Sequence, residues 1–283
     1  MEATGELDRA GATMSAESSP GPVPEDRPTV RSAPTANVAS VVAVVVTRDP
    51  GAALDDTLAS LIAQDHPALS VLVIDDGSAE PVFDRVAAVA PGAYVRRLEH
   101  CVGYGAAANV VMEMVQGATY YLFCHDDVAL APDAVRLLAL TAAQQDASVA
   151  APKLVSWDDH ERFLSLGYAV DRSGLPVPLV ELDDLDQGQH DQVREVTAAH
   201  GAALLVAADV FAALGGFLAS LTSPATGTIP NSATSPGPDL GEDVDLCLRA
   251  RRRGRKIIVV PAARVAHQSV LHGVPGQIGR AHV

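Results

Sequence analysis

Unbroken apolar runs alternate with segments of helical periodicity in the first half of the chain. Residues 41–46 contain only Val and Ala, a run that is typical of a strand covered on both faces. Apolar residues then recur at helical spacing over 54–62, and a second buried run covers 71–74. These segments predict one β-α-β unit with two central parallel strands.

The same alternation continues as far as residue 145. The pattern predicts a short helix over 83–89, a strand over 94–98, a helix over 106–115, a strand over 120–124 and a helix over 133–145. Strands that alternate with helices of this length predict an open α/β sheet with right-handed crossovers.

The second half of the chain contains more Gly and Pro, and we expect it to be more antiparallel and richer in loops. We predict strands at 149–153, 203–206 and 257–260, a helix at 210–214 that Asp209 caps and Gly215 ends, and a helix at 243–253. Residues 218–239 are rich in Ser, Thr, Pro and Gly, and we interpret them as a mobile surface loop.

The two ends differ from the predicted domain, which covers residues 38–274. Residues 1–37 contain few large aliphatic side chains, so we expect a disordered N-terminal tail, and they lack the pattern of a secretory signal. Residues 275–283 are expected to be unstructured. They end in IGRAHV, which looks like the translation of a sequencing-adapter oligonucleotide, so we expect that the natural reading frame was cut here.

Composition narrows the class of protein. Hydrophobic residues make up 48% of the chain, enough to bury a sizeable core. The net charge of −15 argues against a protein that binds nucleic acid by neutralising phosphates. Cys101, Cys124 and Cys247 are irregularly spaced, which fits reduced, buried thiols better than a disulfide framework. No apolar run approaches the ~20 residues that span a bilayer, so we expect the chain as given to be cytoplasmic.

Polar residues follow three of the predicted strands. The first strand ends in Thr47-Arg48-Asp49, the second in Asp75-Asp76-Gly77-Ser78 and the fourth in His125-Asp126-Asp127. Ligands of an open α/β sheet bind outside the carboxyl ends of the strands, so these side chains are candidates for a binding site. Adjacent carboxylates repel each other, and a divalent cation would offset that repulsion. Asp-Asp pairs are also common in turns, and for each pair alone both interpretations stay open.

Two further carboxylates, Glu242 and Asp243, open the predicted helix that follows the 218–239 loop. They could serve a site, or they could only stabilise the first helical turn, which contributes up to ~1 kcal/mol. A Gly-x-Gly turn at 103–105 could approach a phosphate, but a dinucleotide-binding fold carries such a turn after its first strand. His267 follows a short apolar strand and is, on its own, an isolated histidine.

Taken in order, these pieces resemble the family 2 glycosyltransferases, whose members share the GT-A fold. The resemblance covers about residues 38–267 and rests on five ordered motifs, which read VVAVVVTRDPG, VLVIDDGS, LFCHDDVAL, LGGF with GEDVDLCLRARRRG, and VVPAARVAH. It implies an α/β fold with a mixed, mostly parallel sheet flanked by helices.

The resemblance also implies a function, the transfer of a sugar from a nucleotide-diphosphate donor to a hydroxyl acceptor with Mg²⁺ or Mn²⁺. Asp127 would hold the cation, Asp76 would bind the nucleobase, and Thr47 would line the same pocket. Asp243 would be the catalytic base of a single displacement that inverts the anomeric configuration, with Glu242 in support. The paired acidic residues of the three motifs, 75–76, 126–127 and 242–243, are expected to converge on the cation.

One motif departs from the family pattern, because His125 stands where the Asp-x-Asp motif has its first carboxylate. Either His125 is an unusual ligand, or Asp127 and His267 hold the metal with the assistance of Asp126; we favour the second arrangement. The long 218–239 segment is a second departure, and it is either a lid on the acceptor side or an unordered insertion.

Two rival functions remain, a sugar nucleotidyltransferase and a catalytically inactive module that binds nucleotide sugars. The first would need a Gly-rich loop with Lys or Arg after the first strand, where only Arg48 is available. Galactofuranose, rhamnose, glucose and N-acetylglucosamine donors all stay open, as do glycan, lipid-linked and protein acceptors. The chain resembles the cytosolic catalytic part of bacterial cell-envelope glycosyltransferases, so membrane association through a missing C-terminal region is expected.

Overall fold

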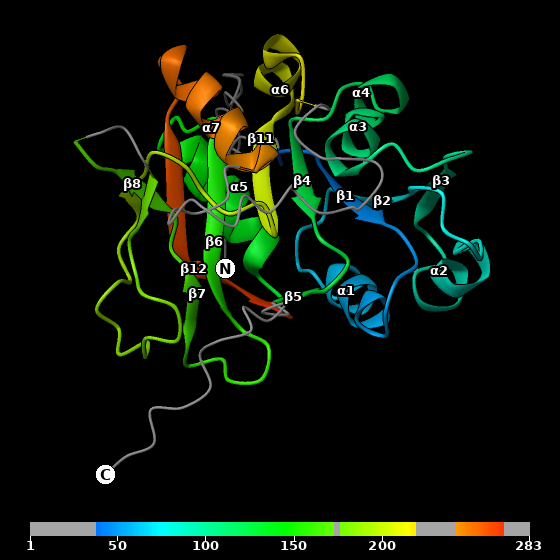
Figure 1. Ribbon diagram of the computed structural model, residues 1–283, viewed down its shortest axis with the longest axis horizontal. Coiled ribbons are helices and arrows are strands. Elements are labelled where there is room, and N and C mark those ends of the chain that lie inside the picture. Colours follow the sequence, from blue (N-terminus) through cyan, green and yellow to red (C-terminus); the bar gives the residue numbers. More distant parts are fainter. Residues whose placement is uncertain (1–37, 173–175, 219–240, 269–283) are drawn as a thin grey trace, which may run out of the picture. The chain divides into compact units, whose positions relative to one another are not determined.

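The computed structural model describes residues 38–172, 176–218 and 241–268 (Figure 1). The predictions for the N-terminal tail at 1–37, for the C-terminal end at 275–283 and for nearly all of the 218–239 loop lie outside the described residues. Within the described part, no helix combines the length and the apolar character that crossing a membrane requires.

A ten-stranded mixed sheet forms the centre of the domain, in the order β10-β12-β6-β11-β4-β1-β2-β3, with β5 paired to β12 and β7 to β6. The parallel half of the sheet confirms the strands predicted from the first 124 residues. It consists of β1 (Val41–Thr47), β2 (Leu69–Asp75), β3 (Tyr94–Arg97) and β4 (Tyr120–Cys124). The run of Val and Ala predicted to be a buried strand is β1, the third strand from one edge, and it is covered on both faces.

The second half of the chain extends the sheet with mostly antiparallel pairings, as its loop-rich sequence predicts. Its strands are β5 (Val128–Leu130), β6 (Val149–Ser156), β7 (Phe163–Ser165), β10 (Arg194–Glu195), β11 (Ala203–Ala207) and β12 (Ile257–His267), and β8 (Tyr168–Val170) with β9 (Pro176–Pro178) forms a separate hairpin. The strand β11 lies antiparallel between β4 and β6, whereas β12 runs parallel to β6.

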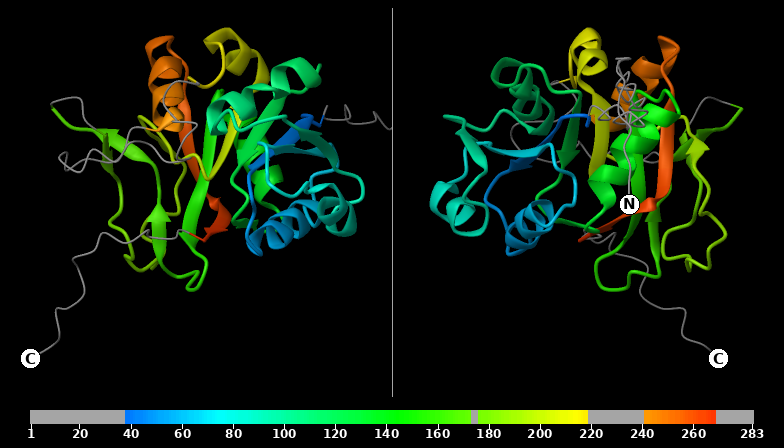
Figure 2. Two further views of the ribbon diagram at one scale, coloured as in Figure 1. Left: turned by 45° about the vertical axis from the view of Figure 1, so that its right-hand side comes forward. Right: turned by 180° about the vertical axis from the view of Figure 1, so that it is seen from behind.

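Helices cover both faces of the sheet (Figure 2). One face packs against α1 (Ala53–Ile62), α2 (Phe83–Val89) and α5 (Ala134–Gln144), and the other against α3 (Tyr104–Asn109), α4 (Val111–Met114), α6 (Ala208–Leu214) and α7 (Glu242–Arg252). Leu54, Leu58 and Leu61 of α1 are fully buried, and each such side chain contributes about 1.5–3 kcal/mol to folding. This three-layer arrangement confirms the expected α/β class.

Several boundaries differ from the predictions. The strand predicted at 257–260 continues to His267, because a bulge between Val260 and Arg264 accommodates Pro261. The predicted cap of α6 is wrong, since Asp209 lies inside the first turn and Ala207 occupies the N-cap position. Gly215 does end this helix, with φ of 78° in the left-handed region.

All three cysteines are free thiols, as predicted. Cys124 and Cys247 are buried, whereas Cys101 is only half-buried. Burial raises the pKa of both Cys124 and Cys247 to about 12, so these thiols stay protonated and behave as small apolar side chains.

Candidate active site

The carboxyl ends of β1, β2 and β4 meet at one edge of the sheet, as the α/β pattern predicts. Thr47 pairs in register with Asp75, and Val45 pairs with Cys124. Because these strands are parallel, the residues that follow them lie side by side. Thr47 donates a hydrogen bond of 2.5 Å from its hydroxyl to the carboxylate of Asp126, which follows β4. Thr47, predicted to line the nucleotide pocket, and Asp126, predicted to assist the metal ligands, are therefore in direct contact.

The acidic pair at the end of β2 organises the surrounding loops. Asp75 is fully buried and forms an ion pair of 3.0 Å with Arg97 of β3. Asp76 accepts hydrogen bonds from the backbone N–H groups of Val102 (2.8 Å) and Gly103 (3.0 Å). Asp75 is thus neutralised by an arginine, and Asp76 fixes the turn that leads into α3. The nucleobase contact assigned to Asp76 stays a prediction.

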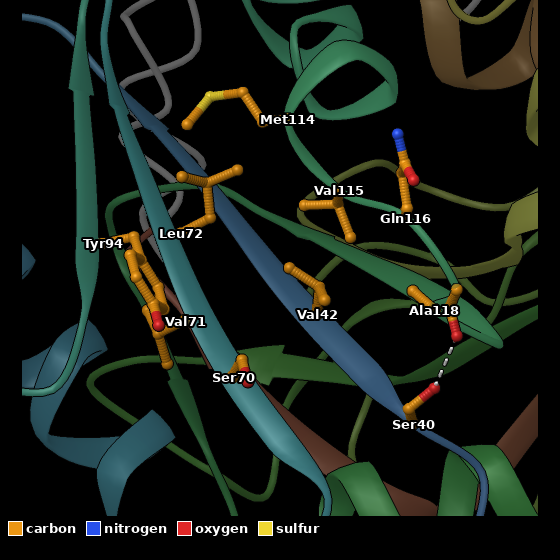
Figure 3. A pocket seen from close by; sticks show the side chains of 11 residues that line it. Ser40, Val42, Ser70, Val71, Leu72, Tyr94, Met114, Val115, Gln116 and Ala118 are labelled. Carbon is orange, nitrogen blue, oxygen red and sulfur yellow. Dashed lines mark hydrogen bonds between the residues drawn. The ribbon is translucent and has the colours of Figure 1, made fainter.

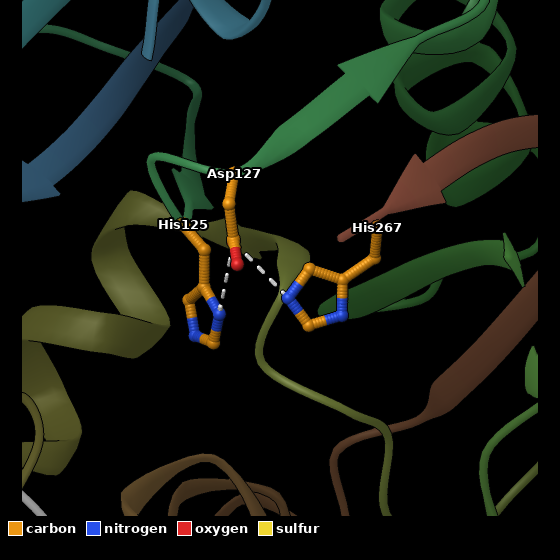
Figure 4. A group of neighbouring side chains, drawn as sticks. All are labelled: His125, Asp127 and His267. Atoms are coloured by element: carbon orange, nitrogen blue, oxygen red, sulfur yellow. Dashed lines mark ion pairs between the residues drawn. The ribbon is translucent and has the colours of Figure 1, made fainter. Parts of the chain in front are cut away.

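Three residues form a compact cluster with the character of a metal site, namely His125, Asp127 and His267. Their ligand atoms all lie within 4.8 Å of one another. The Asp127 carboxylate lies between the two imidazoles, with Oδ1 3.1 Å from Nε2 of His267 and 3.9 Å from Nδ1 of His125 (Figure 4). Two imidazoles and a carboxylate are a ligand set that suits a transition-metal ion such as Mn²⁺.

A buried oxygen in this cluster points to a bound cation. Oδ1 of Asp127 is buried, and despite its distance from His267 it has no hydrogen-bond partner of acceptable geometry among the described residues. Buried carboxylate oxygens are normally hydrogen-bonded or coordinated, because leaving one without a partner is costly. A bound cation would give this oxygen a well-directed contact, which its ion pair with His267 does not provide.

Pairing between two strands brings this cluster together. The last residue of β12, His267, pairs with Val128 of β5, and the backbone N–H of Gln268 donates to the carbonyl oxygen of Asp127 at 2.9 Å. Figure 1 shows β5 beside the end of β12, which is drawn in red. The three-residue strand β5 thus places Asp127, some 140 residues away in sequence, next to His267.

The electrostatic surroundings keep the cluster ready to coordinate. Burial, together with the neighbouring His267 and His200, lowers the pKa of His125 to about 3, so its imidazole is neutral and has a lone pair to donate. Burial alone would raise the pKa of Asp127, but His267 and His125 lower it below its ordinary value. Asp127 is therefore a carboxylate at neutral pH.

Asp126 does not belong to the cluster, which contains His125 in its place. Its carboxylate is engaged by Thr47, and burial, with the charge of Asp127, raises its pKa. The geometry therefore favours the first arrangement considered for this motif, with His125 as a ligand, over the assisting role that we expected of Asp126.

The acidic residues at the start of α7 lie in the same region. Asp243 accepts hydrogen bonds from the backbone N–H groups of Gly201 (2.5 Å) and Val244 (2.8 Å). Glu242 is buried, and burial followed by the charge of Asp243 raises its pKa. The N-cap residue of α7 is Gly241, which has no side chain, so neither acidic residue caps the helix from that position. Asp243 satisfies one N–H group of the first turn, that of Val244, and its second bond goes to Gly201 outside the helix. Stabilisation of the helix start therefore explains only part of the arrangement of Asp243.

His200 is a site residue that the sequence analysis missed. Its ring centroid lies 5.6 Å from that of His267 and 6.2 Å from that of His125, and its Nδ1 accepts a hydrogen bond from Ala202 N–H at 3.0 Å. The next residue, Gly201, holds Asp243. His200 thus connects the histidine cluster to the carboxylate of α7. It precedes β11, and only the antiparallel pairing of β11 with β4 brings it to the carboxyl end of β4.

A separate pocket of about 390 Å³ lies near the opposite ends of the parallel strands. Apolar side chains form much of its wall, as Figure 3 shows for Val42, Leu72, Met114 and Val115. None of the residues predicted to serve the site lines this pocket, so it is unrelated to the cluster at the carboxyl edge.

Comparison with known proteins relates the chain to one family. Residues 39–272 match the family described as "Glycosyltransferase like family 2". Among curated proteins, no relative matches the sequence.

Solved structures share the fold. A crystal structure of GalNAc-T7 with UDP, GalNAc and Mn²⁺ matches with a TM-score of 0.62 and 17% identity over 82% of this chain. Two crystal structures of S. aureus TarS, one of residues 1–349, match with TM-scores of 0.56 and 0.54 and 16% identity over 81% of this chain. This chain spans 44% of the first protein and 36% and 60% of the others. These similarities confirm the predicted GT-A fold.

Proposed function

The chain belongs to glycosyltransferase-like family 2, and on that premise we propose that it transfers a sugar from a nucleotide-diphosphate donor to a hydroxyl acceptor with the aid of a divalent cation. One observation carries the proposal. The cluster of His125, Asp127 and His267 lies at the carboxyl edge of the sheet, where α/β folds bind their ligands. The presence of UDP and Mn²⁺ in the related GalNAc-T7 structure supports the same choice of donor and cation.

A cation bound at this cluster would stabilise the negative charge that develops on the leaving diphosphate. His125 and His267 would supply neutral nitrogen ligands, and Asp127 a charged oxygen ligand. The buried Oδ1 of Asp127, which lacks a well-directed hydrogen bond among the described residues, would gain a ligand contact in this arrangement. Mn²⁺ suits this set of two nitrogens and one oxygen better than Mg²⁺, which prefers oxygen ligands.

The protein's own residues divide the remaining tasks. Thr47 and Asp76 lie at the ends of β1 and β2 and are assigned to the nucleoside, and Asp126 is assigned to the same side through its bond to Thr47. Asp243 is assigned to the acceptor, from whose hydroxyl it takes the proton. Asp243 accepts hydrogen bonds from two backbone N–H groups, which hold its carboxylate in place, and Glu242 lies beside it as a supporting group. One base and one displacement give inversion at the anomeric carbon.

The proposed acceptor is a glycan or a lipid-linked glycan of a bacterial cell envelope. This choice follows from the sequence resemblance to envelope glycosyltransferases, and the fold shared with S. aureus TarS is compatible with it. The residues proposed above serve the nucleoside, the cation and the acceptor, so other side chains must recognise the transferred sugar.

Replacement of Asp243 by Asn tests the assignment of the base. We expect Asp243→Asn to abolish sugar transfer while the affinity for the sugar nucleotide stays within about twofold, since the amide keeps the size of the side chain but cannot take a proton. Transfer is measured as release of the nucleoside diphosphate, and binding by isothermal titration calorimetry. Asp245→Asn is the matched control, because Asp245 lies on the same helix and pairs with Arg249 at 2.6 Å. Normal turnover by Asp243→Asn would contradict the assignment.

A further inference from the structure

Tyr104 has a buried hydroxyl without a hydrogen-bond partner. The residue opens α3, directly after the Gly103 turn, and within the described parts of the chain its hydroxyl oxygen is covered but unbonded. A buried tyrosine hydroxyl normally finds a partner, and each exception in a folded protein calls for an explanation. A ligand group that binds beside it would provide the missing partner.

The surroundings of the ring place this hydroxyl in the candidate site. The Tyr104 ring meets the His125 ring edge-on, with centroids 5.4 Å apart, and lies 6.0 Å from the ring of Phe217. Burial raises the pKa of Tyr104 well above its ordinary value, and the charges of Glu242 and Asp243 raise it further. The ring contact with His125 places the phenol beside the histidine cluster, and burial keeps it protonated.

The local backbone holds Tyr104 firmly in this place. Asp76 accepts hydrogen bonds from the N–H groups of Val102 and Gly103. The φ of Gly103 is 89°, a conformation that favours glycine. A Cβ atom on Gly105 would lie 3.2 Å from Cβ of Phe217 and 3.6 Å from Oε1 of Glu242. Only a small residue allows this close approach of α3 to α7. The backbone on both sides of Tyr104 is therefore held in place.

We propose that the Tyr104 hydroxyl donates a hydrogen bond to an oxygen of the sugar that is transferred, and that it helps to select this sugar. The inference rests on the proposed function. In a single displacement the sugar lies between the leaving diphosphate, which the cation cluster holds, and the base, Asp243. Tyr104 contacts the His125 ring of that cluster, and the residue after it approaches Glu242, the neighbour of the base.

A sugar hydroxyl suits the position of this phenol. The residue after Tyr104 lies close to the start of α7, since a Cβ atom on Gly105 would lie 3.6 Å from Oε1 of Glu242. A sugar hydroxyl can accept from the phenol and donate to a carboxylate. The group that completes the Tyr104 hydrogen bond is therefore a hydroxyl of the sugar.

The substitution Tyr104→Phe removes only this hydroxyl. Binding is measured by isothermal titration calorimetry in Mn²⁺ with UDP-glucose, UDP-N-acetylglucosamine, UDP-galactofuranose and dTDP-rhamnose, and with UDP and dTDP alone. We expect Tyr104→Phe to weaken the sugar nucleotide that the wild type binds best by roughly 3- to 10-fold, and to leave UDP or dTDP unchanged. Its melting temperature should equal or exceed that of the wild type, because the hydroxyl has no partner within the described structure.

The control is Tyr121→Phe, which removes a hydroxyl from β4 that lies 3.5 Å from the carbonyl oxygen of Val115. It should leave all these affinities unchanged. Equal affinities for the sugar nucleotide in wild type and Tyr104→Phe, or an equal loss for sugar nucleotide and free nucleotide, would overturn the role of Tyr104. Failure of the proposed function looks different, because the wild-type protein would then bind none of these nucleotides.

Discussion

At the scale of single residues, the contact between Gly201 and Asp243 fixes the position of the proposed base. The Gly201 N–H donates to Oδ2 of Asp243, and a Cβ atom at position 201 would lie 3.0 Å from both Cβ and Oδ2 of Asp243. That distance is shorter than an ordinary van der Waals contact, so a side chain here would push the carboxylate away. The glycine is therefore part of what positions the proposed base.

The substitution Gly201→Ala should displace the Asp243 carboxylate. We expect kcat to fall by about 10- to 100-fold, because small displacements of a catalytic group are costly, while affinity for the sugar nucleotide changes little. Steady-state kinetics combined with titration calorimetry separate the two effects. Gly51→Ala is the control, since a Cβ atom there meets nothing within 4 Å. A Gly201→Ala protein with normal kcat would show that Asp243 does not need its present position.

Some residues of the site could be predicted singly and others only through the fold. Asp127 and His267 were predicted as metal ligands from their places in two motifs, and the structure brings them together. Tyr104 and His200 were not predicted. Tyr104 is the middle residue of the Gly-x-Gly turn at 103–105, but that pattern indicates only a close approach of the backbone, and no pattern surrounds His200. The position of His200 depends on an antiparallel strand pairing, and that of Tyr104 on the approach of α3 to α7.

At the scale of elements, a buried ionic cluster ties a loop to β6. Lys153 of β6 is 2% exposed, and its Nζ lies 2.7 Å from Asp186 and 2.8 Å from Asp191. Both acids belong to the acidic loop that follows β9, and Arg264 of β12 lies 3.7 Å from Asp186. A buried ammonium without its carboxylates would be strongly destabilising. Residues 181–191 are rich in Asp and Glu, but no pattern in the sequence pairs them with a lysine inside the predicted strand 149–153.

The substitution Asp186→Asn should destabilise the protein by about 1.5–3 kcal/mol, since it deprives a buried lysine of one carboxylate while Asp191 stays in place. Although burial raises the pKa of Asp186, Lys153 and other donors lower it below its ordinary value. A carboxyl group whose pKa is lower in the folded protein than in the unfolded chain, where it is ~4, stabilises the fold at pH values above ~4. This stability is lost as the pH falls through the pKa of the folded protein. Wild-type stability should therefore fall more steeply below pH 4 than that of Asp186→Asn.

Urea denaturation at pH 7 and between pH 3 and pH 5 measures both effects. Asp184→Asn is a suitable control, because Asp184 is exposed in the same loop. If Asp186→Asn unfolded at the same urea concentration as the wild type at pH 7, the ionic cluster would make no net contribution.

Long periodic elements could be predicted from the sequence, and short or interrupted ones could not. The parallel strands of the first half and most helices lie close to their predicted positions, because each carries several apolar residues in register with its period. The strand β5 has three residues, too few for a pattern, and β12 contains a proline that ordinarily ends a strand. These two strands together position Asp127 and His267, so the metal site depends on the elements that were hardest to predict.

At the scale of the whole molecule, the acidic residues of the three motifs have other partners than the sequence analysis expects. The three acidic pairs were predicted to converge on a cation, but only Asp127 joins the cluster. Asp75 is paired with Arg97, Asp76 with backbone N–H groups, and Asp126 with Thr47. Histidines provide the other two candidate ligands. The acidic residues of these motifs therefore organise loops as much as they serve metal chemistry.

The measurement that tests the central claim most directly is the cation dependence of sugar-nucleotide turnover. Release of UDP or dTDP from the preferred donor is followed after treatment with EDTA and again after addition of Mn²⁺, for the wild type, Asp127→Asn and the exposed control Asp56→Asn of α1. We predict that EDTA abolishes turnover by the wild type and the control, that Mn²⁺ restores it, and that Asp127→Asn stays at least about 100-fold slower. Turnover that persists without a cation, or that Asp127→Asn leaves unchanged, would contradict the account.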